Sequence, residues 1–371
     1  MQVLRAIPRA AGLRQEGRRR GRWRVGAVLP VSSAAALVVA ATLWMLAPAT
    51  AAAGEQTLSA RDIRQNLFGA CFVSPTEGWV VGDLGRVLRT SDGGRTWIKQ
   101  EVAAREPFLS VSCTDGQHAW LSSRHGRIYR TSDGGGTWAV ATAPVDRNLF
   151  KVVFSTPSRG TAVGDFGVIV HSEDGGATWE RISLPDDFKL PDSVLDTGVD
   201  PGDAILYGLS FADADHGWIA GEFGTLLATT DGGRSWRQLP SGLESTLFGI
   251  GFADAQHGIA VGIDGVILAT EDGGQSWKRL PAPFAERSYY DVAISGKYGW
   301  IVGGQGTLLR SSDGGRTWQA QSVPIKYAAD WFRGLSLVGD RGFLVGGSGL
   351  IYTTAGDSAV LLRDAQSERR S

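Results

Sequence analysis

The sequence predicts an all-β fold, a seven-bladed β-propeller of four-stranded antiparallel blades. A box of the form Ser/Thr-x-Asp-Gly-Gly-x-Thr/Ser-Trp occurs six times, and its tryptophans are 41, 41, 57, 41 and 41 residues apart. A short apolar segment, in most copies bounded by glycines, precedes each box and occurs a seventh time at residues 342–346. A fixed period of this size is typical of radially repeated small sheets. The boxes end at Trp97, Trp138, Trp179, Trp236, Trp277 and Trp318.

Each repeat contains four short apolar segments, here called strands A to D, which are separated by turn residues. In the fifth repeat they are residues 247–252, 258–261, 266–270 and 276–280. The A–B turn is polar, the B–C turn is tight, and the C–D turn is the box. Four antiparallel strands repeated seven times form a ring that protects its strand edges. A β-helix is the alternative, but its coils are shorter and parallel.

The first box, residues 90–97, indicates what the repeated residues do. Asp92 is expected to accept hydrogen bonds from backbone N–H groups of its own turn. Gly93 and Gly94 permit the positive φ angles of a tight turn. Trp97 is expected to bury its indole against the neighbouring sheet. The box therefore closes each blade, and neither catalysis nor glycan binding is needed to explain it.

The seventh repeat is degenerate, since Leu361 stands where the other copies have tryptophan. Terminal repeats are commonly atypical. Two segments are candidates for the strand that closes the last blade. One is the segment of residues 58–64, which would add a strand from the N-terminal side. The other is the segment of residues 359–362.

Residues 1–54 are predicted to be a signal peptide or an N-terminal membrane anchor. The first 24 residues carry eight arginines and one acid, and residues 25–54 carry no charge. A basic region, an apolar core and small residues at 51–53 are typical of a secretion signal. The uncharged stretch is also long enough to span a bilayer. Both alternatives place the folded part in the periplasm or a lumen, in the second case tethered to the inner membrane by residues 25–53.

Residues 55–363 are predicted to form the propeller, and residues 364–371 a polar tail. The long step between the third and fourth boxes places about 16 extra residues within 185–203, before the fourth blade. This insertion carries six aspartates without the spacing of a calcium-binding loop, so a solvated loop is favoured. The formal net charge of −1 gives no overall field that would favour nucleic acid.

The two cysteines, Cys71 and Cys113, fall on the first strands of repeats one and two. A disulfide between them can form in an oxidising compartment. Two separately buried thiols are the favoured interpretation. The sequence has no Cys-x-x-Cys and no His/Cys cluster, so neither a metal nor a cofactor is expected.

The repeat also resembles a known family. The pattern Ser/Thr-x-Asp-x-Gly-x-Thr-Trp is similar to the Asp-box, or bacterial neuraminidase, repeat. Joined to the preceding Gly78-Trp79-Val80-Val81-Gly82, it resembles the photosystem II stability/assembly factor family over about residues 60–360. That resemblance implies a seven-bladed propeller on the lumenal or periplasmic side of a membrane. It also implies a role in assembling membrane-protein complexes.

The main alternative is a sialidase-like glycoside hydrolase or a glycan-binding propeller, because those proteins use the same box. Residues 61–64 do not match the Arg-Ile-Pro motif that opens sialidase domains. The acids expected near the functional face are scattered one per turn, whereas a retaining glycosidase needs two close carboxyl groups. His118, His216 and His257 repeat at one turn position, which indicates turn chemistry. No catalytic residue is predicted.

A partner is predicted to bind the face of the ring that carries the B–C turns and D–A loops, opposite the boxes. Loops on a rigid scaffold commonly carry binding residues. The arginines there would suit an acidic peptide segment, and the phenylalanines would anchor a partner. The alternative is that the arginines serve solubility and the phenylalanines pack over neighbouring turns. The candidate partner-binding residues are Arg86, Arg105, Arg124, Arg127, Arg147, Phe166 and Phe223.

Together these observations predict an exported, non-catalytic propeller that acts as a protein-interaction scaffold. The expected partner is a membrane-protein complex or an envelope protein, and no nucleic acid.

Overall fold

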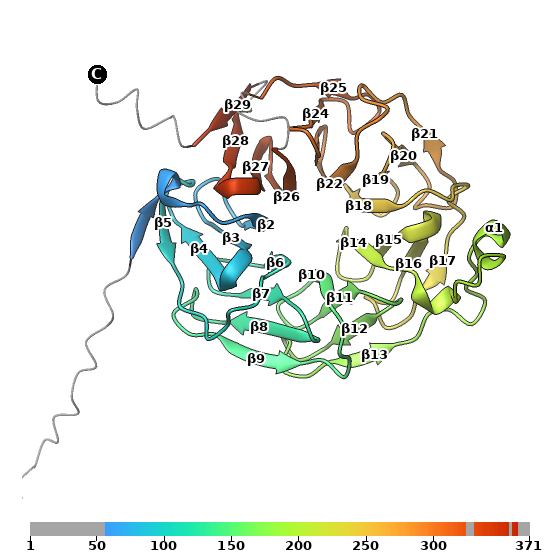
Figure 1. The fold of residues 1–371 in the computed structure, drawn as a ribbon, viewed down its shortest axis with the longest axis horizontal. Coiled ribbons are helices and arrows are strands. Elements are labelled where there is room, and N and C mark those ends of the chain that lie inside the picture. The colour runs from blue at the N-terminus through green and yellow to red at the C-terminus, as the bar shows by residue number, and fades with distance from the viewer. Residues whose placement is uncertain (1–55, 324–329, 356–357, 363–371) are drawn as a thin grey trace, which may run out of the picture. The chain divides into compact units, whose positions relative to one another are not determined.

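The computed structural model describes residues 56–323, 330–355 and 358–362 of the 371-residue chain. All of them belong to one compact unit, Ala52–Ser371. Seven antiparallel sheets surround a central axis (Figure 1), which confirms the predicted seven-bladed β-propeller. The predicted signal peptide or anchor lies outside the described residues. Among the helices that are described, none is long and apolar enough to cross a membrane.

The strands of each blade follow one another from the axis outward. The A strands surround the axis and are β2 (Leu67–Phe72), β6 (Ser110–Cys113), β10 (Leu149–Phe154), β14 (Leu206–Phe211), β18 (Leu247–Phe252), β22 (Tyr289–Ser295) and β26 (Phe332–Val338). The B strands are β3 (Gly78–Gly82), β7 (Ala119–Ser122), β11 (Gly160–Gly164), β15 (Gly217–Gly221), β19 (Gly258–Gly262), β23 (Tyr298–Gly303) and β27 (Arg341–Gly346). The C strands are β4 (Arg86–Thr90), β8 (Arg127–Thr131), β12 (Ile169–Ser172), β16 (Leu226–Thr229), β20 (Ile267–Thr270), β24 (Leu308–Ser311) and β28 (Ile351–Ala355). The D strands are β5 (Thr96–Lys99), β9 (Ala139–Thr142), β13 (Glu180–Ile182), β17 (Arg237–Gln238), β21 (Lys278–Arg279), β25 (Gln319–Ala320) and β29 (Ser358–Leu361).

The predicted strands of blade 5 agree with the structure to within one residue for A, B and C. The D strand β21 is shorter than predicted. It starts later because the N–H of Ser276 donates to Asp272 Oδ1 at 2.9 Å and its hydroxyl donates to Asp272 Oδ2, which holds this residue in the box turn.

Several neighbouring blades are in contact through flat aromatic pairs between a B strand and the next A strand. Trp120 of β7 stacks on Phe154 of β10 with ring centroids 3.7 Å apart. Trp218 of β15 stacks on Phe252 of β18 at 3.5 Å. The indole N–H of Trp120 also donates to the Gly175 carbonyl of the next blade's box at 2.9 Å. These two interfaces therefore bury a large apolar area, and in both of them the indole N–H has a carbonyl acceptor in the next blade's box.

The ring is closed by packing between blades 1 and 7 and not by a shared strand. β29 is the fourth strand of blade 7, so the candidate at residues 359–362 is correct and the candidate at residues 58–64 is wrong. The N-terminal strand β1 (Thr57–Ser59) instead pairs with β5 as a fifth strand of blade 1, followed by the 3₁₀ turn η1 (Ala60–Asp62). Phe72 stacks on Phe343 of blade 7 at 3.5 Å, and its N–H donates to Ser336 Oγ at 2.9 Å. Because this seam is already apolar and hydrogen-bonded, β1 is free to cover the outer edge of blade 1.

A disulfide joins Cys71 of β2 to Cys113 of β6, with their Cα atoms 5.9 Å apart. The favoured expectation of two separate thiols is wrong. The two A strands are direct neighbours at the axis, and the cysteines stand at the register where the strands face each other. The bridge therefore links blade 1 covalently to blade 2 across 42 residues of sequence.

The boxes have the predicted turn geometry. In blade 5, Asp272 accepts from the Ser276 N–H at 2.9 Å and from the Thr270 hydroxyl at 2.8 Å. The Gly273 N–H donates to the Gln256 carbonyl of the A–B turn at 2.9 Å. Equivalent bonds occur in the other five boxes, around Asp92, Asp133, Asp174, Asp231 and Asp313. The A–B turns and boxes thus share one face of the ring, called the box face below.

Candidate functional site

The opposite face carries the B–C turns and the D–A loops and is called the tip face below. Each of its seven B–C turns places a non-glycine residue and then a glycine at positive φ. Positive φ at both central residues characterises the type I′ hairpin turn, whose twist matches that of the flanking strands. The non-glycine residues have φ between 53° and 57° and are Leu84, His125, Phe166, Phe223, Asp264, Gln305 and Ser348. Three of these turns are the elements η2 (Asp83–Gly85), η4 (Glu222–Gly224) and η5 (Gly347–Gly349). In each of them the N–H of the next residue donates to the carbonyl three residues earlier, which is the hydrogen bond of a 3₁₀ turn.

Three tips carry bulky apolar side chains in this unfavourable conformation, and those of Leu84 and Phe166 are exposed. The left-handed region is visited mainly by glycine, asparagine and aspartate, and it is costly for other side chains. Leu84 is nevertheless 76% exposed and Phe166 is 47% exposed. Core packing does not explain these two residues, and strained positions of this kind cluster at binding surfaces.

The five predicted arginines lie on consecutive turns and loops of blades 1 to 3. The backbone at Gly85, next to Arg86, packs against the loop that carries Arg105. The Gly126 N–H donates to the Arg147 carbonyl at 2.8 Å, which joins the tip of blade 2 to the following loop. The structure thus brings these arginines to one sector of the tip face.

The arginines differ in their partners. Arg127 donates to Glu106 at 2.9 Å, and Glu106 also accepts from the Tyr129 hydroxyl at 2.8 Å. The side chains of Arg86, Arg105 and Arg124 make no hydrogen bond or ion pair with any residue that the structure describes. In the predicted set and within the described residues, these three guanidinium groups are therefore the ones without a hydrogen bond or an ion pair.

The two predicted phenylalanines also differ. The guanidinium of Arg147 lies 4.8 Å from the ring centre of Phe166, so these two residues form one exposed cation–π pair. Phe223 is only partly exposed, because it packs against an apolar cluster that contains Phe188 and Leu190 of the insertion. The insertion contains the helix α1 (Asp192–Leu195) and the 3₁₀ turn η3 (Pro201–Asp203). Phe223 therefore packs against the insertion, whereas Phe166 is exposed.

The acids of the tip face mostly hold its own loops. Asp83 accepts from the side-chain amide of Asn66 at 2.8 Å, and Asp165 accepts from the Asn148 N–H at 3.2 Å. Glu222 accepts from the Ile205 N–H at 3.0 Å. Within the described part of the chain, no group of three or more His, Cys, Asp and Glu side chains could hold a metal ion.

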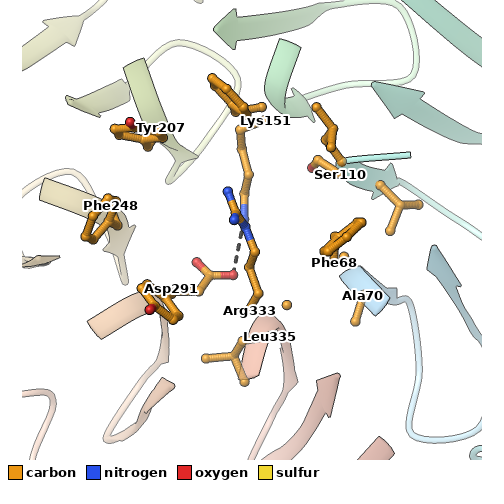
Figure 2. A pocket seen from close by; sticks show the side chains of 15 residues that line it. Phe68, Ala70, Ser110, Lys151, Tyr207, Phe248, Asp291, Arg333 and Leu335 are labelled. Atoms are coloured by element: carbon orange, nitrogen blue, oxygen red, sulfur yellow. Dashed lines mark hydrogen bonds and ion pairs between the residues drawn. The ribbon is translucent and has the colours of Figure 1, made fainter. Parts of the chain in front are cut away.

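The tip face surrounds the mouth of a central channel that contains a cavity of about 220 Å³ (Figure 2). Each A strand after the first follows a D–A loop, so the first residues of the A strands lie at this mouth. The second residues of the repeat form a collar around it: Phe68, Leu109, Phe150, Tyr207, Phe248, Tyr290 and Arg333. Neighbouring rings of the collar are in contact, with centroids 5.4 Å apart for Phe150 and Tyr207 and 5.2 Å apart for Tyr207 and Phe248.

Below the collar, Lys151 of β10 reaches across the channel to Asp291 of β22, with Nζ 3.2 Å from Oδ2. Asp291 is buried, and one of its oxygens also accepts from the Val292 N–H at 3.0 Å. At the rim, burial and the neighbouring Glu222 carboxylate raise the pKa of Tyr207 to about 12. The phenol therefore stays protonated and donates to Glu222 at 3.4 Å.

The channel residues were not among the binding residues predicted from the sequence. The signal was present, since the second position of the A strand is aromatic in five of the seven repeats. The alternation of a strand places that position on the opposite side from the buried first residue. Lys151 and Asp291 follow at the third position, where four repeats have glycine.

The Asp-box turns, the seven blades and the variable tip face define an Asp-box repeat propeller. The chain belongs to the family described as photosynthesis system II assembly factor YCF48, whose model matches residues 104–201, 235–295 and 280–360, together more than half of the chain. This confirms the family resemblance drawn from the repeat. No curated protein sequence matches the chain significantly.

Solved structures show the same fold at low identity. YCF48 bound to a D1 peptide is 19% identical with a TM-score of 0.64, covering 82% of this chain and 95% of that one. YCF48 from Cyanidioschyzon merolae is 23% identical with a TM-score of 0.62, covering 78% and 95%. The GH74 xyloglucanase from Xanthomonas campestris is 14% identical with a TM-score of 0.60, covering 81% and 53%. At these identities the likeness concerns the fold alone.

Proposed function

We propose that this chain is an exported, non-catalytic assembly or stability factor that binds a segment of a membrane protein through its tip face. Membership of the YCF48 family supports this role, and a YCF48 structure contains a bound D1 peptide. The observation that carries the proposal is the sector with three unpartnered arginines beside the exposed Leu84 and the Arg147–Phe166 pair. Such a surface suits an acidic segment that also offers apolar side chains.

The test is capture of partners from detergent-solubilised membranes of the source organism. The triple variant Arg86→Glu/Arg105→Glu/Arg124→Glu should recover at least roughly tenfold less of the proteins that wild type enriches, because three exposed charge pairs are lost together. Arg127 is left unchanged, since its pair with Glu106 would otherwise be broken.

The matched control is Arg181→Glu/Arg237→Glu/Arg279→Glu, on the exposed D strands of blades 3, 4 and 5. It makes the same change in charge away from the tip face and should capture as wild type does. An equal loss of captured membrane protein in both triple variants would indicate that the arginines serve solubility and not binding. Hydrolysis of a sialoside or xyloglucan by wild type, abolished by a tip-face substitution, would instead favour the glycosidase alternative.

Export is part of the proposal, and the disulfide supports it because such bridges persist mainly in oxidising compartments. Thiol labelling of protein from intact cells should find Cys71 and Cys113 blocked until a reductant is added. Free thiols in protein trapped directly from growing cells would contradict the proposed location.

A further inference from the structure

The channel mouth contains a cation without a matching anion. Arg333 starts in β26 and extends to the centre of the channel, toward Lys151 and Asp291 (Figure 2). Among the described residues, Arg333 makes no hydrogen bond and no ion pair. Of the two cations, only Lys151 is paired with Asp291, at 3.2 Å.

The acids at the rim do not supply the missing partner. Glu222 is engaged by the Ile205 N–H and the Tyr207 hydroxyl, and Asp165 by the Asn148 N–H. A guanidinium donates through a planar fork that matches a carboxylate, which it binds with two parallel hydrogen bonds. The guanidinium of Arg333 at the mouth is therefore suited to bind a carboxylate.

The surroundings of Arg333 are apolar and aromatic. Phe68, Tyr207 and Phe248 surround the mouth, and Trp331 stacks on Phe68 at 5.9 Å. Partial exclusion of water by these rings strengthens a charged hydrogen bond formed between them. The same rings offer a surface for one apolar side chain next to the carboxylate.

The size and shape of the cavity limit the ligand. Its volume of about 220 Å³ is below the range that is usual for pockets that enclose a whole small molecule. The cavity lies along the axis of the ring, so a peptide enters it end-on. An acidic residue in the middle of a peptide could reach the cavity only if the peptide entered and left through the same opening. A chain terminus carries a carboxylate and an adjacent side chain on a single strand.

We propose that the channel mouth binds the free C-terminal carboxylate of an apolar peptide end, with Arg333 holding the carboxylate and the aromatic collar holding the last side chain. This inference rests on the proposed function, because it names the part of the partner that enters the ring. The arginine sector of blades 1 to 3 would then bind a different stretch of the same partner.

The probe is a fluorescein-labelled hexapeptide of glycine, alanine and leucine that ends in phenylalanine, followed by fluorescence anisotropy with the full chain. Three forms are compared: the free C-terminal acid, the C-terminal amide, and an amide with an internal glutamate. The free acid should bind at least about tenfold more tightly than either amide, because a hydrogen-bonded pair with a charged group contributes about 1.5–3 kcal/mol. Equal binding of acid and amide, or no binding of the acid at up to about 1 mM, would overturn the proposal.

Arg333→Gln should lower the affinity for the free acid to that of the amide, and Arg333→Lys should keep part of it. The side chain is exposed and makes no bond in the described structure, so the melting temperature of both variants should equal that of wild type. Undiminished acid binding by Arg333→Gln would contradict the assignment. The control Arg181→Gln/Arg237→Gln/Arg279→Gln, on the exposed D strands of blades 3 to 5, should bind the hexapeptide as wild type does. Failure of wild type to bind the peptide, while Arg86→Glu/Arg105→Glu/Arg124→Glu still captures less membrane protein, would contradict the channel proposal and leave the proposed function standing.

Discussion

The box face and the tip face of the ring carry the turns at the two opposite ends of the same strands. On the box face, the turns are fixed by side chains. Each box aspartate accepts from a hydroxyl two residues earlier and from an N–H four residues later, as Asp133 does with Thr131 and Thr137. The box glycine then ties the turn to the neighbouring A–B turn.

On the tip face, the turns are fixed by the backbone. All seven tips use the same two positive φ angles, and the glycine in the second position is the only side-chain requirement that they share. The first position holds six residue types over the seven blades, from Phe166 and Phe223 to Asp264 and Ser348. A glycine supplies the second positive φ without strain, so the preceding side chain can differ from blade to blade.

The difference indicates that the two faces have different functions. Side-chain hydrogen bonds on the box face hold the fold, and the disulfide at the box-face ends of β2 and β6 adds to it. The tip face can change its chemistry without changing the fold. Stability should therefore respond to the box face, and binding to the tip face.

The largest effect on stability is expected from the disulfide. Cys71→Ser/Cys113→Ser should lower the free energy of unfolding by about 2–4 kcal/mol, because the bridge restricts a loop of 42 residues in the unfolded chain. Urea unfolding followed by tryptophan fluorescence measures this. A reductant should lower the stability of wild type to that of the variant and leave the variant unchanged. A variant as stable as oxidised wild type would show that the bridge contributes nothing to the ring.

A smaller loss is expected from one box, and blade 5 offers a matched pair at the two ends of β20. Asp272→Asn on the box face should cost about 1–2 kcal/mol, since it weakens hydrogen bonds that a charged acceptor receives. Asp264→Asn on the tip face should change stability by less than about 0.5 kcal/mol, since asparagine tolerates the left-handed conformation. Similar losses in both variants would remove the distinction between the faces.

Acid should weaken the box face in a defined pH range. Hydrogen bonds from Thr137 lower the pKa of Asp133 to about 2, and those from Ser276 do the same for Asp272. A folded-state pKa below the usual 3.8 means that the stabilisation is fully present above about pH 4. It is lost as the pH falls from about 4 to 2, because the unfolded chain takes up protons on these carboxyl groups over this range and the folded chain does so only near pH 2. Asp133→Asn/Asp272→Asn should therefore show a shallower loss of stability over this range than wild type, and parallel curves would contradict it.

The sequence predicted the parts of the molecule that repeat. The boxes specify turns through Asp92 and its equivalents, and alternating apolar segments specify the strands, so blade number and the two faces could be predicted. Ring closure could not, because residues 57–59 carry no feature that distinguishes an added strand on blade 1 from one on blade 7; the packing of Phe72 on Phe343 decides it. The pairing of Cys71 with Cys113 depends on how closely two A strands approach, which sequence spacing does not give.

The candidate site was predicted less completely, for a related reason. The arginines of blades 1 to 3 could be assigned to a face from topology alone. Which of them has a partner depends on individual contacts such as that of Arg127 with Glu106. The channel depends on residues from all seven blades meeting at the axis, as Lys151 and Asp291 do from 140 positions apart. The strain at Leu84 is a backbone property that only the structure shows.

The smallest effect on stability, and one opposite in sign, is expected at Leu84. This side chain is 76% exposed at a positive φ of 57°, so it contributes little burial and occupies an unfavourable conformation. Leu84→Asn should raise the free energy of unfolding by up to about 1 kcal/mol, because asparagine adopts this conformation more readily. If the tip face binds the partner, the same substitution should reduce membrane-protein capture, since an exposed apolar anchor is lost. The matched control is Gln305→Asn, at the equivalent tip of blade 6, which should leave capture unchanged. A loss of stability in Leu84→Asn would instead show that leucine is held there by packing within the ring.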